Sequence, residues 1–288
     1  MPQSQDINND YQKRINRVLT YIQDNIGKSF LLKELAEVGH FSPFHFHRIL
    51  SAFLGEPLGA YIKRKRLEKG AHLLLFSNSS VTDISIAVGY ETLSSFSAAF
   101  SKHFHLSPSE YRLQHESLKP FENMETPTKI NFDFLPIIKS IPPTRVAFVR
   151  AFGPYGSEST GKAWNTLMHF ADKNGLLRKE TQLLGISYDN PEIVKENKCE
   201  YNACISLEKD IRPEGEVGIK ELKGGKYAVF TYKGSYTHFP VVYGLIFKEW
   251  LLKSDHELRD NEVFDHYVNS PNDTGTEELI TEIYLPIK

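Results

Sequence analysis

One pattern occurs twice in the first third of the chain and constrains its fold more than any other feature. Residues 41–54 read FSPFHFHRILSAFL, and residues 90–104 read YETLSSFSAAFSKHF. In each copy a serine or threonine follows an aromatic residue, where a helix N-cap is expected, and apolar residues then recur at helical spacing. A shorter apolar helical segment, ending near Gly39 or Gly89, precedes each copy. This repeat predicts two helix-turn-helix units.

Helical periodicity covers the chain as far as residue 115. A long helix is predicted for residues 57–76, between the two units, and its outer face carries the basic run 63–69. Such a run is usually a solvated helix face, although some of its side chains could contact phosphates. Residues 116–128 are rich in Glu, Pro, Asn and Thr, which is typical of a linker.

Beyond the linker the periodicity changes to the alternation of strands. Two amphipathic helices lie between these strands, so the second part is predicted to be an α+β domain. Gly153-Pro154-Tyr155 and Gly234-Ser235-Tyr236 each follow a strand and precede a helix, which indicates two related strand-helix-strand-strand halves. The predicted strands are 130–134, 145–152, 200–207, 225–233 and 278–285, and the predicted helices are 161–174 and 239–252.

Composition describes an ordinary globular protein, with 40% hydrophobic residues, 24% charged residues and a net charge of −2. The sequence has neither an apolar run long enough to span a bilayer nor a signal peptide, so we expect no membrane partner. Its two cysteines, Cys199 and Cys204, fit a reducing compartment, and the cytoplasm is the expected location.

The exposed face of each repeated helix supplies candidate DNA-binding residues. In the first helix, Arg48 can make a bidentate contact with guanine, His47 can donate to a base edge, and Phe44 can lie against a thymine methyl group. The second helix offers shorter side chains and is expected to read shape or phosphates. In the alternative interpretation, Phe44 and one histidine simply pack the domain. The predicted set is Ser42, Phe44, His45, His47, Arg48, Leu93, Ser94, Ser95, Ser97 and Ala98.

Aromatic residues are dense in the second part, and Asp265 alternates there with two of them. Aromatic walls with one carboxylate suit a lipophilic cation or another flat apolar ligand, although such residues also build ordinary cores. No local motif resembles a catalytic, phosphate-binding or metal-binding signature, so we expect neither an enzyme nor a cofactor or metal. The predicted effector-binding set is Trp164, Tyr188, Phe230, Tyr232, Trp250, Asp265 and Tyr267.

Residues 8–115 resemble the DNA-binding domain of the AraC/XylS family. The resemblance is carried by DISIAVGY at 83–90, FSAAF at 96–100 and SPSEYR at 107–112. It implies seven helices and two helix-turn-helix units joined by a long helix. It also implies that two sets of side chains face the bases. The chain departs from the family at Ala98, where arginine is common, and at His40, where the turn usually has glycine. The base-facing positions are Phe44, His47, Arg48, Leu93, Ser94 and Ala98.

Residues 129–288 resemble the gyrase-inhibitor-like (GyrI-like) effector-binding domain, in the domain order of the Rob-like branch. The matching segments include FGPY at 152–155, GISYDNP at 185–191 and FDHY at 264–267. The resemblance implies a duplicated module that binds small, often cationic, lipophilic molecules between its halves. Asp265 stands where the family has glutamate.

These observations predict a bacterial transcription regulator. It is expected to bind double-stranded promoter DNA, sense a small-molecule effector and activate transcription through contact with RNA polymerase. An enzyme that acts in the C-terminal pocket remains an alternative. So does a ligand-independent DNA-binding protein whose second domain docks another protein.

Overall fold

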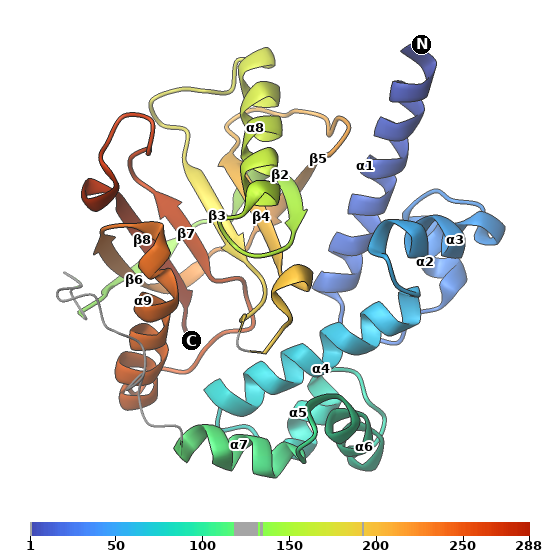
Figure 1. Ribbon diagram of the computed structural model, residues 1–288, viewed down its shortest axis with the longest axis vertical. Coiled ribbons are helices and arrows are strands. Elements are labelled where there is room, and N and C mark those ends of the chain that lie inside the picture. The colour runs from blue at the N-terminus through green and yellow to red at the C-terminus, as the bar shows by residue number, and fades with distance from the viewer. Residues whose placement is uncertain (1, 118–131, 133–134, 192) are drawn as a thin grey trace. The chain divides into compact units, whose positions relative to one another are not determined.

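The computed structural model describes residues 2–117, 132, 135–191 and 193–288. The chain forms two compact units, one helical and one built on a β-sheet (Figure 1). The strand predicted for 130–134 lies outside the described residues except for Phe132, whose backbone bridges that of Tyr232. Most of the predicted linker 116–128 also lies outside them, so the predicted boundaries 8–115 and 129–288 stay predictions.

The helical unit contains seven described helices, in agreement with the sequence prediction. The two repeated segments form α3 and α6, each after a short helix and a tight turn. Between them in the chain lies α4, which packs against α3, α5, α6 and α7. The helices are α1 (Pro2–Asp24), α2 (Leu32–Val38), α3 (Pro43–Leu54), α4 (Leu58–Phe76), α5 (Val81–Ala87), α6 (Leu93–Phe104) and α7 (Pro108–Ser117).

The predicted helix starts are found at both repeats. Ser42 and Thr92 occupy the N-cap positions of α3 and α6 with extended backbone angles. Only Thr92 caps with its side chain, because its Oγ1 accepts a hydrogen bond of 3.1 Å from the backbone N–H of Ser95. The apolar face of α6 is anchored by Phe96 and Phe100, which are fully buried. These buried rings fix which side of the helix faces outward.

The second unit is a single eight-stranded antiparallel sheet with the order β1-β6-β8-β7-β3-β4-β2-β5. The central strands, β7 and β3, pair in a register that places Gly185 opposite Asp265. The strands are β1 (Ile137–Ile141), β2 (Thr144–Phe152), β3 (Leu183–Ser187), β4 (Glu200–Ser206), β5 (Val217–Leu222), β6 (Gly225–Lys233), β7 (Phe264–Tyr267) and β8 (Ile280–Pro286).

Two long helical segments follow β2 and β6. The first is α8 (Glu158–Lys173), whose Ala163, Leu167 and Phe170 pack on one face of the sheet. The second begins as α9 (Phe239–Leu245) and continues as a π-helical turn over Ile246–Trp250. Both were expected from amphipathic periodicity. On the other face of the sheet a separate core includes Phe148, Leu184, Tyr227 and Phe264.

Candidate functional site

The outward face of α3 and its N-cap carry four of the five side chains of the first repeat that were predicted to contact DNA. Ser42, His45, His47 and Arg48 are all exposed, whereas Phe46, on the opposite side, is fully buried. The side chain of Phe44 lies outside the described part of the structure. Residues two apart on a helix point about 200° from each other, so His45 and His47 lie on opposite flanks. Arg48 lies between them on the side away from the core.

The corresponding face of α6 is smaller and less basic. Alignment of the buried Phe96 with Phe46 places Ala98 where α3 has Arg48 and Ser97 where α3 has His47. Leu93, Ser94, Ser95 and Ala98 are exposed and Ser97 is half-buried. The Ser95 hydroxyl donates to the carbonyl of Thr92 over 2.8 Å, so it is already used in the helix cap. The described side chains of the predicted set therefore lie on outward faces of both helices, with unequal hydrogen-bonding reach.

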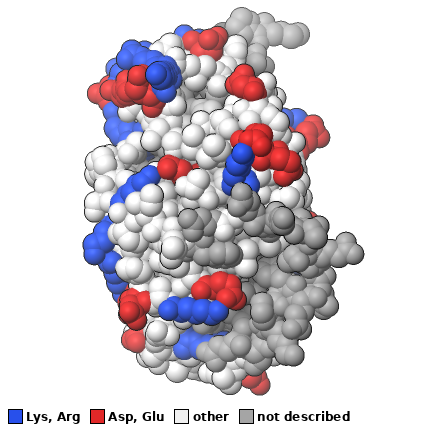
Figure 2. Space-filling model, turned by 90° about the vertical axis from the view of Figure 1, so that its left-hand side faces the viewer, with Lys and Arg blue, Asp and Glu red and all other residues white. Residues whose placement is uncertain are grey.

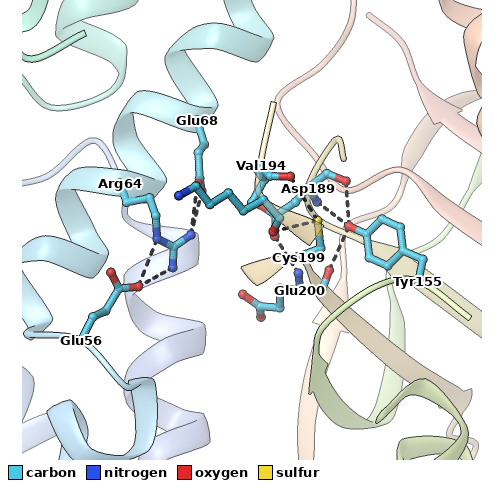
Figure 3. A network of polar contacts seen from close by, with 9 residues as sticks. Glu56, Arg64, Glu68, Tyr155, Asp189, Val194, Cys199 and Glu200 are labelled. Atoms are coloured by element: carbon cyan, nitrogen blue, oxygen red, sulfur yellow. Dashed lines mark hydrogen bonds and ion pairs between the residues drawn. The ribbon is translucent and has the colours of Figure 1, made fainter. Parts of the chain in front are cut away.

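Part of the basic run on α4 is engaged within the domain rather than directed at solvent. The guanidinium of Arg64 bridges Glu56 over 2.7 Å and Glu68 over 3.0 Å, and all three side chains are largely buried (Figure 3). Burial alone would lower the pKa of Arg64, but Glu68 and Glu56 raise it above its ordinary value, so the guanidinium stays charged. Lys63 remains exposed on the same helix.

In the sheet unit, Asp265 lies in a cluster of aromatic side chains at the centre of the sheet. Asp265 is 1% exposed, and its carboxyl group accepts a hydrogen bond of 2.6 Å from the hydroxyl of Tyr243 on α9. Burial raises the pKa of Asp265 to about 7, and the Tyr243 hydrogen bond opposes that rise. Near neutral pH the carboxyl group is therefore poised between its neutral and charged forms. We call the surrounding side chains the aromatic cluster; they are Tyr155, Trp164, Tyr201, Tyr236, Tyr243 and Tyr267.

The aromatic cluster is held by ring contacts and by a short chain of hydrogen bonds. The indole N–H of Trp164 donates to the Tyr201 hydroxyl over 3.1 Å, and the Tyr201 and Tyr267 hydroxyls lie 3.1 Å apart. The Tyr267 ring meets those of Trp164 and Tyr236 edge-on, with centroids 5.8 Å and 5.2 Å apart. Burial raises the pKa of Tyr236 to about 12 with help from the nearby Asp265. Its phenol therefore stays protonated and available as a donor.

A glycine on β3 makes room for this arrangement. A Cβ atom on Gly185 would clash with the hydroxyls of both Tyr201 and Tyr267. Because Gly185 is the register partner of Asp265, the two phenols converge beside the carboxyl group. The position thus requires the absence of a side chain.

Tyr155 fixes one edge of the aromatic cluster. Its hydroxyl donates to the carbonyl of Asp189 over 2.7 Å and accepts from the backbone N–H of the same residue over 2.9 Å (Figure 3). The Asp189 carboxylate in turn accepts from the backbone N–H of Glu200 over 2.7 Å. These bonds tie the loop after β3 to the start of β4. They hold the Tyr155 ring 6.2 Å from that of Tyr201.

The structure brings together three of the seven predicted effector-binding residues, Trp164, Asp265 and Tyr267. Phe230 and Trp250 pack on each other, with ring centroids 5.1 Å apart. Tyr232 is buried and shares a hydrogen bond of 3.0 Å with Nδ1 of His238.

Tyr188 packs against the core on the other face of the sheet. There its hydroxyl accepts hydrogen bonds from Lys220 and Asn202.

Sequence reasoning left Tyr155, Tyr201, Tyr236 and Tyr243 out of the site. For Tyr155 and Tyr236 a signal existed, because each stands two residues after the glycine that ends a strand in its half of the domain. Tyr243 lies on the helical face that looks like ordinary core in the sequence.

Charges of both signs are interspersed on the face of the molecule in Figure 2. Within the described ranges, no helix is both long and apolar enough to cross a membrane.

Comparison with protein families assigns both units. Residues 136–288 match the family described as "GyrI-like small molecule binding domain", and residues 35–114 match a helix-turn-helix domain family.

Several curated relatives are transcriptional regulators. The transcriptional activator AarP of Providencia stuartii is 31% identical over 99 residues, which cover 34% of this chain and 73% of AarP. The uncharacterised regulator YbfP of Bacillus subtilis is 29% identical over 102 residues, and that match spans only 35% of either protein.

Solved structures resemble each unit separately. An AraC-type DNA-binding regulator from Chromobacterium violaceum is 23% identical, with a TM-score of 0.35, and the match covers 38% of this chain and 96% of that one. The C-terminal domain of EcmrR is 16% identical, with a TM-score of 0.45, over 55% of this chain and 99% of that one. The family matches and the named relatives lead to one assignment: the chain belongs to the GyrI-like small-molecule-binding family and carries an AraC-type helix-turn-helix domain similar to those of the transcriptional regulators that it matches.

Proposed function

We propose that this regulator is a cytoplasmic bacterial activator that binds promoter DNA sequence-specifically and contacts RNA polymerase. Two helix-turn-helix units, joined by α4, insert α3 and α6 into successive major-groove segments. The outward faces of both helices support this proposal, since the exposed side chains there are polar or small, except Leu93, and lie opposite buried aromatic residues. AarP, which is named as an activator, supports the direction of regulation.

The two recognition helices have different tasks. On α3, Arg48 and His47, with Phe44, make most of the direct base contacts. On α6, Ala98 and the serines follow groove shape and phosphates, because their side chains are too short for bidentate pairing. His45, on the flank opposite His47, contacts the phosphate backbone.

The effector is a lipophilic aromatic cation that binds in the aromatic cluster. The observation that carries this proposal is the placement of Asp265, a residue that is 1% exposed and lies among the aromatic side chains of the cluster. A buried carboxylate needs a positive partner, and aromatic faces attract the same cation. Such a ligand would displace the Tyr243 hydroxyl from the carboxyl group and replace one hydrogen bond with a charge pair.

The order of the strands supports the proposed duplication of the sheet unit. In one half, β2 is followed by α8, β3 and β4; in the other, β6 is followed by α9, β7 and β8. The pairings β2–β4 and β4–β3 correspond to β6–β8 and β8–β7. The two halves meet at the β3–β7 pair, beside Asp265. The proposed effector site therefore lies between the halves.

Tetraphenylphosphonium and its neutral analogue triphenylphosphine oxide provide a direct test. The cation should raise the melting temperature and bind in calorimetry, because a ligand that binds only the folded state stabilises it. The neutral analogue should bind much more weakly. Asp265→Asn should abolish most of the difference, whereas Tyr188→Phe, on the other face of the sheet, should retain it. Equal binding of the two compounds by the wild-type protein would refute a cation site.

A further inference from the structure

The turn after α1 lies directly against the turn of the second helix-turn-helix unit. A Cβ atom on Gly27 would clash with the backbone carbonyl oxygen of Ala87. A Cβ atom on Gly89 would lie 2.8 Å from the carbonyl oxygen of Gly27, which is also too close. Backbone thus meets backbone at this point, and both glycines are required by space. Gly89 also has a φ of 85°, which glycine adopts at little cost.

Arg66, from the middle of α4, holds this contact together. Its Nε donates to the carbonyl of Ile26 over 3.0 Å, and its Nη2 donates to the carbonyl of Lys28 over 2.5 Å. The same Nη2 lies 2.8 Å from the position that a Cβ on Gly89 would take. Carbonyls beyond the end of a helix lack partners within the helix, and a guanidinium can bond two of them in a fixed geometry.

Neighbouring groups fix the orientation of the guanidinium. It lies over the ring of Phe30, 5.9 Å from the centroid, which adds a cation–π contact. Burial lowers the pKa of Arg66, and the neighbouring Tyr90 opposes that change. Arginine remains charged under these conditions, since its ordinary pKa is far above neutrality.

We propose that Arg66, Gly27 and Gly89 form a clamp that fixes the offset between α3 and α6, and with it the spacing of the two DNA segments that the protein reads. The turn at Gly27 belongs to the first unit, because it follows α1, which packs on α2, and α2 packs on α3. Gly89 belongs to the turn before α6. The clamp adds a second connection beside α4, so the two units cannot swing about that helix.

The clamp matters for spacing because two major-groove segments on one face of DNA are about 34 Å apart, one helical turn. Insertion of one base pair both lengthens this separation and rotates the second segment by about a tenth of a turn. A rigid pair of helices cannot follow that change, whereas a hinged pair can. Arg66 is therefore a positioning residue, and this role rests on the proposed binding of DNA by both helices.

Binding-site selection from a random-sequence duplex pool, followed by fluorescence anisotropy, tests the clamp with the full-length protein. The wild-type protein should select two blocks at one spacing, and its affinity should fall about tenfold or more when one base pair is added or removed between them, which corresponds to ~1.4 kcal/mol. Arg66→Ala and Gly27→Ala should bind the parent site more weakly. Their affinities for the parent spacing and for the altered spacing should also differ by no more than about threefold, because the two helix-turn-helix units can then move relative to each other.

Two control variants match these changes. Gly59→Ala adds the same methyl group on α4, where a Cβ would meet nothing within 4 Å, and should keep the wild-type spacing preference. Arg17→Ala removes an exposed positive charge from α1 and should also keep it. Thermal melting verifies that each variant is folded. Should Arg66→Ala not fold, Gly27→Ala still tests the clamp, since it removes neither a charge nor a hydrogen bond.

The possible outcomes separate the clamp from the proposed function. Folded clamp variants that discriminate spacing as strongly as the wild-type protein would overturn the clamp and leave DNA binding intact. A wild-type protein that selects only one block, or none, would instead refute the proposed two-helix binding and remove the basis of the clamp.

Discussion

The carboxyl group of Asp265 links the stability of the protein to pH. Its pKa in the folded protein is about 7, well above the ordinary value of 3.8, because it is buried. The folded state therefore holds this proton more tightly than the unfolded state does. The stabilisation from that proton is complete below pH 3.8 and is lost as the pH rises through 7. The shift corresponds to at most about 4 kcal/mol.

Asp265→Asn should remove this dependence. Because an amide does not ionise, the variant should melt at a higher temperature than the wild-type protein at pH 8, and the difference should shrink at pH 5. Differential scanning calorimetry at the two pH values measures this. Asp273→Asn, at an exposed position, serves as the control and should follow the wild-type profile. An identical pH profile for Asp265→Asn and the wild-type protein would contradict the buried-acid interpretation.

Single side chains on α3 should differ in their effect on DNA affinity. Arg48→Ala should cost about 1–3 kcal/mol at the selected site and much less on a scrambled duplex, because a bidentate base contact is lost. His45→Ala, on the flank of the helix, should weaken binding to both duplexes by a similar amount, which should be smaller than the loss caused by Arg48→Ala at the selected site. Anisotropy titrations on the two duplexes compare the variants. Equal losses on both duplexes for Arg48→Ala would show that Arg48 contacts only phosphates.

At this scale the sequence was informative where a residue's neighbours in the chain decide its role. Asp265 and Tyr267 could be selected together because they alternate on one short strand. Tyr243 could not, because its contact with Asp265 depends on how α9 packs on a strand 22 positions away. In the same way, Arg64 looked like part of a solvated basic face, and only the fold shows its pairing with Glu56 and Glu68.

At the scale of elements, the two helix-turn-helix turns differ in one informative position. His40 has a φ of 52° in the first turn, at the place where the second turn has Gly89 with a φ of 85°. A left-handed conformation costs a residue with a side chain about 1–2 kcal/mol, and substitution by glycine relieves this cost. Glycine also loses more conformational entropy on folding, which cancels part of the gain in stability. His40→Gly should therefore stabilise the protein by about 0.5–1 kcal/mol.

Chemical denaturation can measure this change. His103→Gly, in the last turn of α6, is the matched control, because the same substitution in a right-handed helical position should destabilise by several tenths of a kcal/mol. If both substitutions destabilise the protein, conformational strain at His40 is not the dominant effect.

The central strands of the sheet should tolerate little change. Gly185→Ala would drive a methyl group into the hydroxyls of Tyr201 and Tyr267, so it should cost about 1–3 kcal/mol in stability. It should also weaken tetraphenylphosphonium binding at least tenfold, because the phenols beside Asp265 must move. Gly161→Ala on α8, where a Cβ meets nothing within 4 Å, should leave tetraphenylphosphonium binding unchanged and should raise stability slightly, because alanine favours the helix more than glycine does. Calorimetric titration measures the affinity of each folded variant for tetraphenylphosphonium. An unchanged affinity in Gly185→Ala would contradict the role of Gly185 in placing the two phenols.

Whole elements were predicted well where their periodicity was long. The helix predicted for 57–76 is α4, and the strand predicted for 225–233 is β6. The sequence did not predict β1, β3, β5 or β7, because each has only four to six residues and its pairing depends on strands that are distant in the chain. The helix predicted for 239–252 is interrupted by the π-helical turn at Ile246–Trp250, which amphipathic spacing does not reveal.

At the scale of the whole molecule, a regulator must couple its two binding events. If a cation in the aromatic cluster changes the affinity for promoter DNA by some factor, bound DNA must change the affinity for the cation by the same factor. Coupling free energies of this kind are typically about 1–3 kcal/mol, or about 5–150-fold. We expect tetraphenylphosphonium to tighten binding of the selected duplex within this range.

The reciprocal measurement makes this prediction sharp. DNA affinity is measured by anisotropy with and without saturating cation, and cation affinity is measured by calorimetry with and without saturating duplex. Both ratios should agree and should fall to one in Asp265→Asn, which keeps the DNA-binding helices unchanged. A cation that binds normally while both ratios equal one in the wild-type protein would show that the helical unit and the sheet unit bind their ligands independently. In that case Asp265 would hold a ligand without regulating DNA binding. A ligand that binds the DNA-free and DNA-bound protein equally well does not change the affinity for DNA.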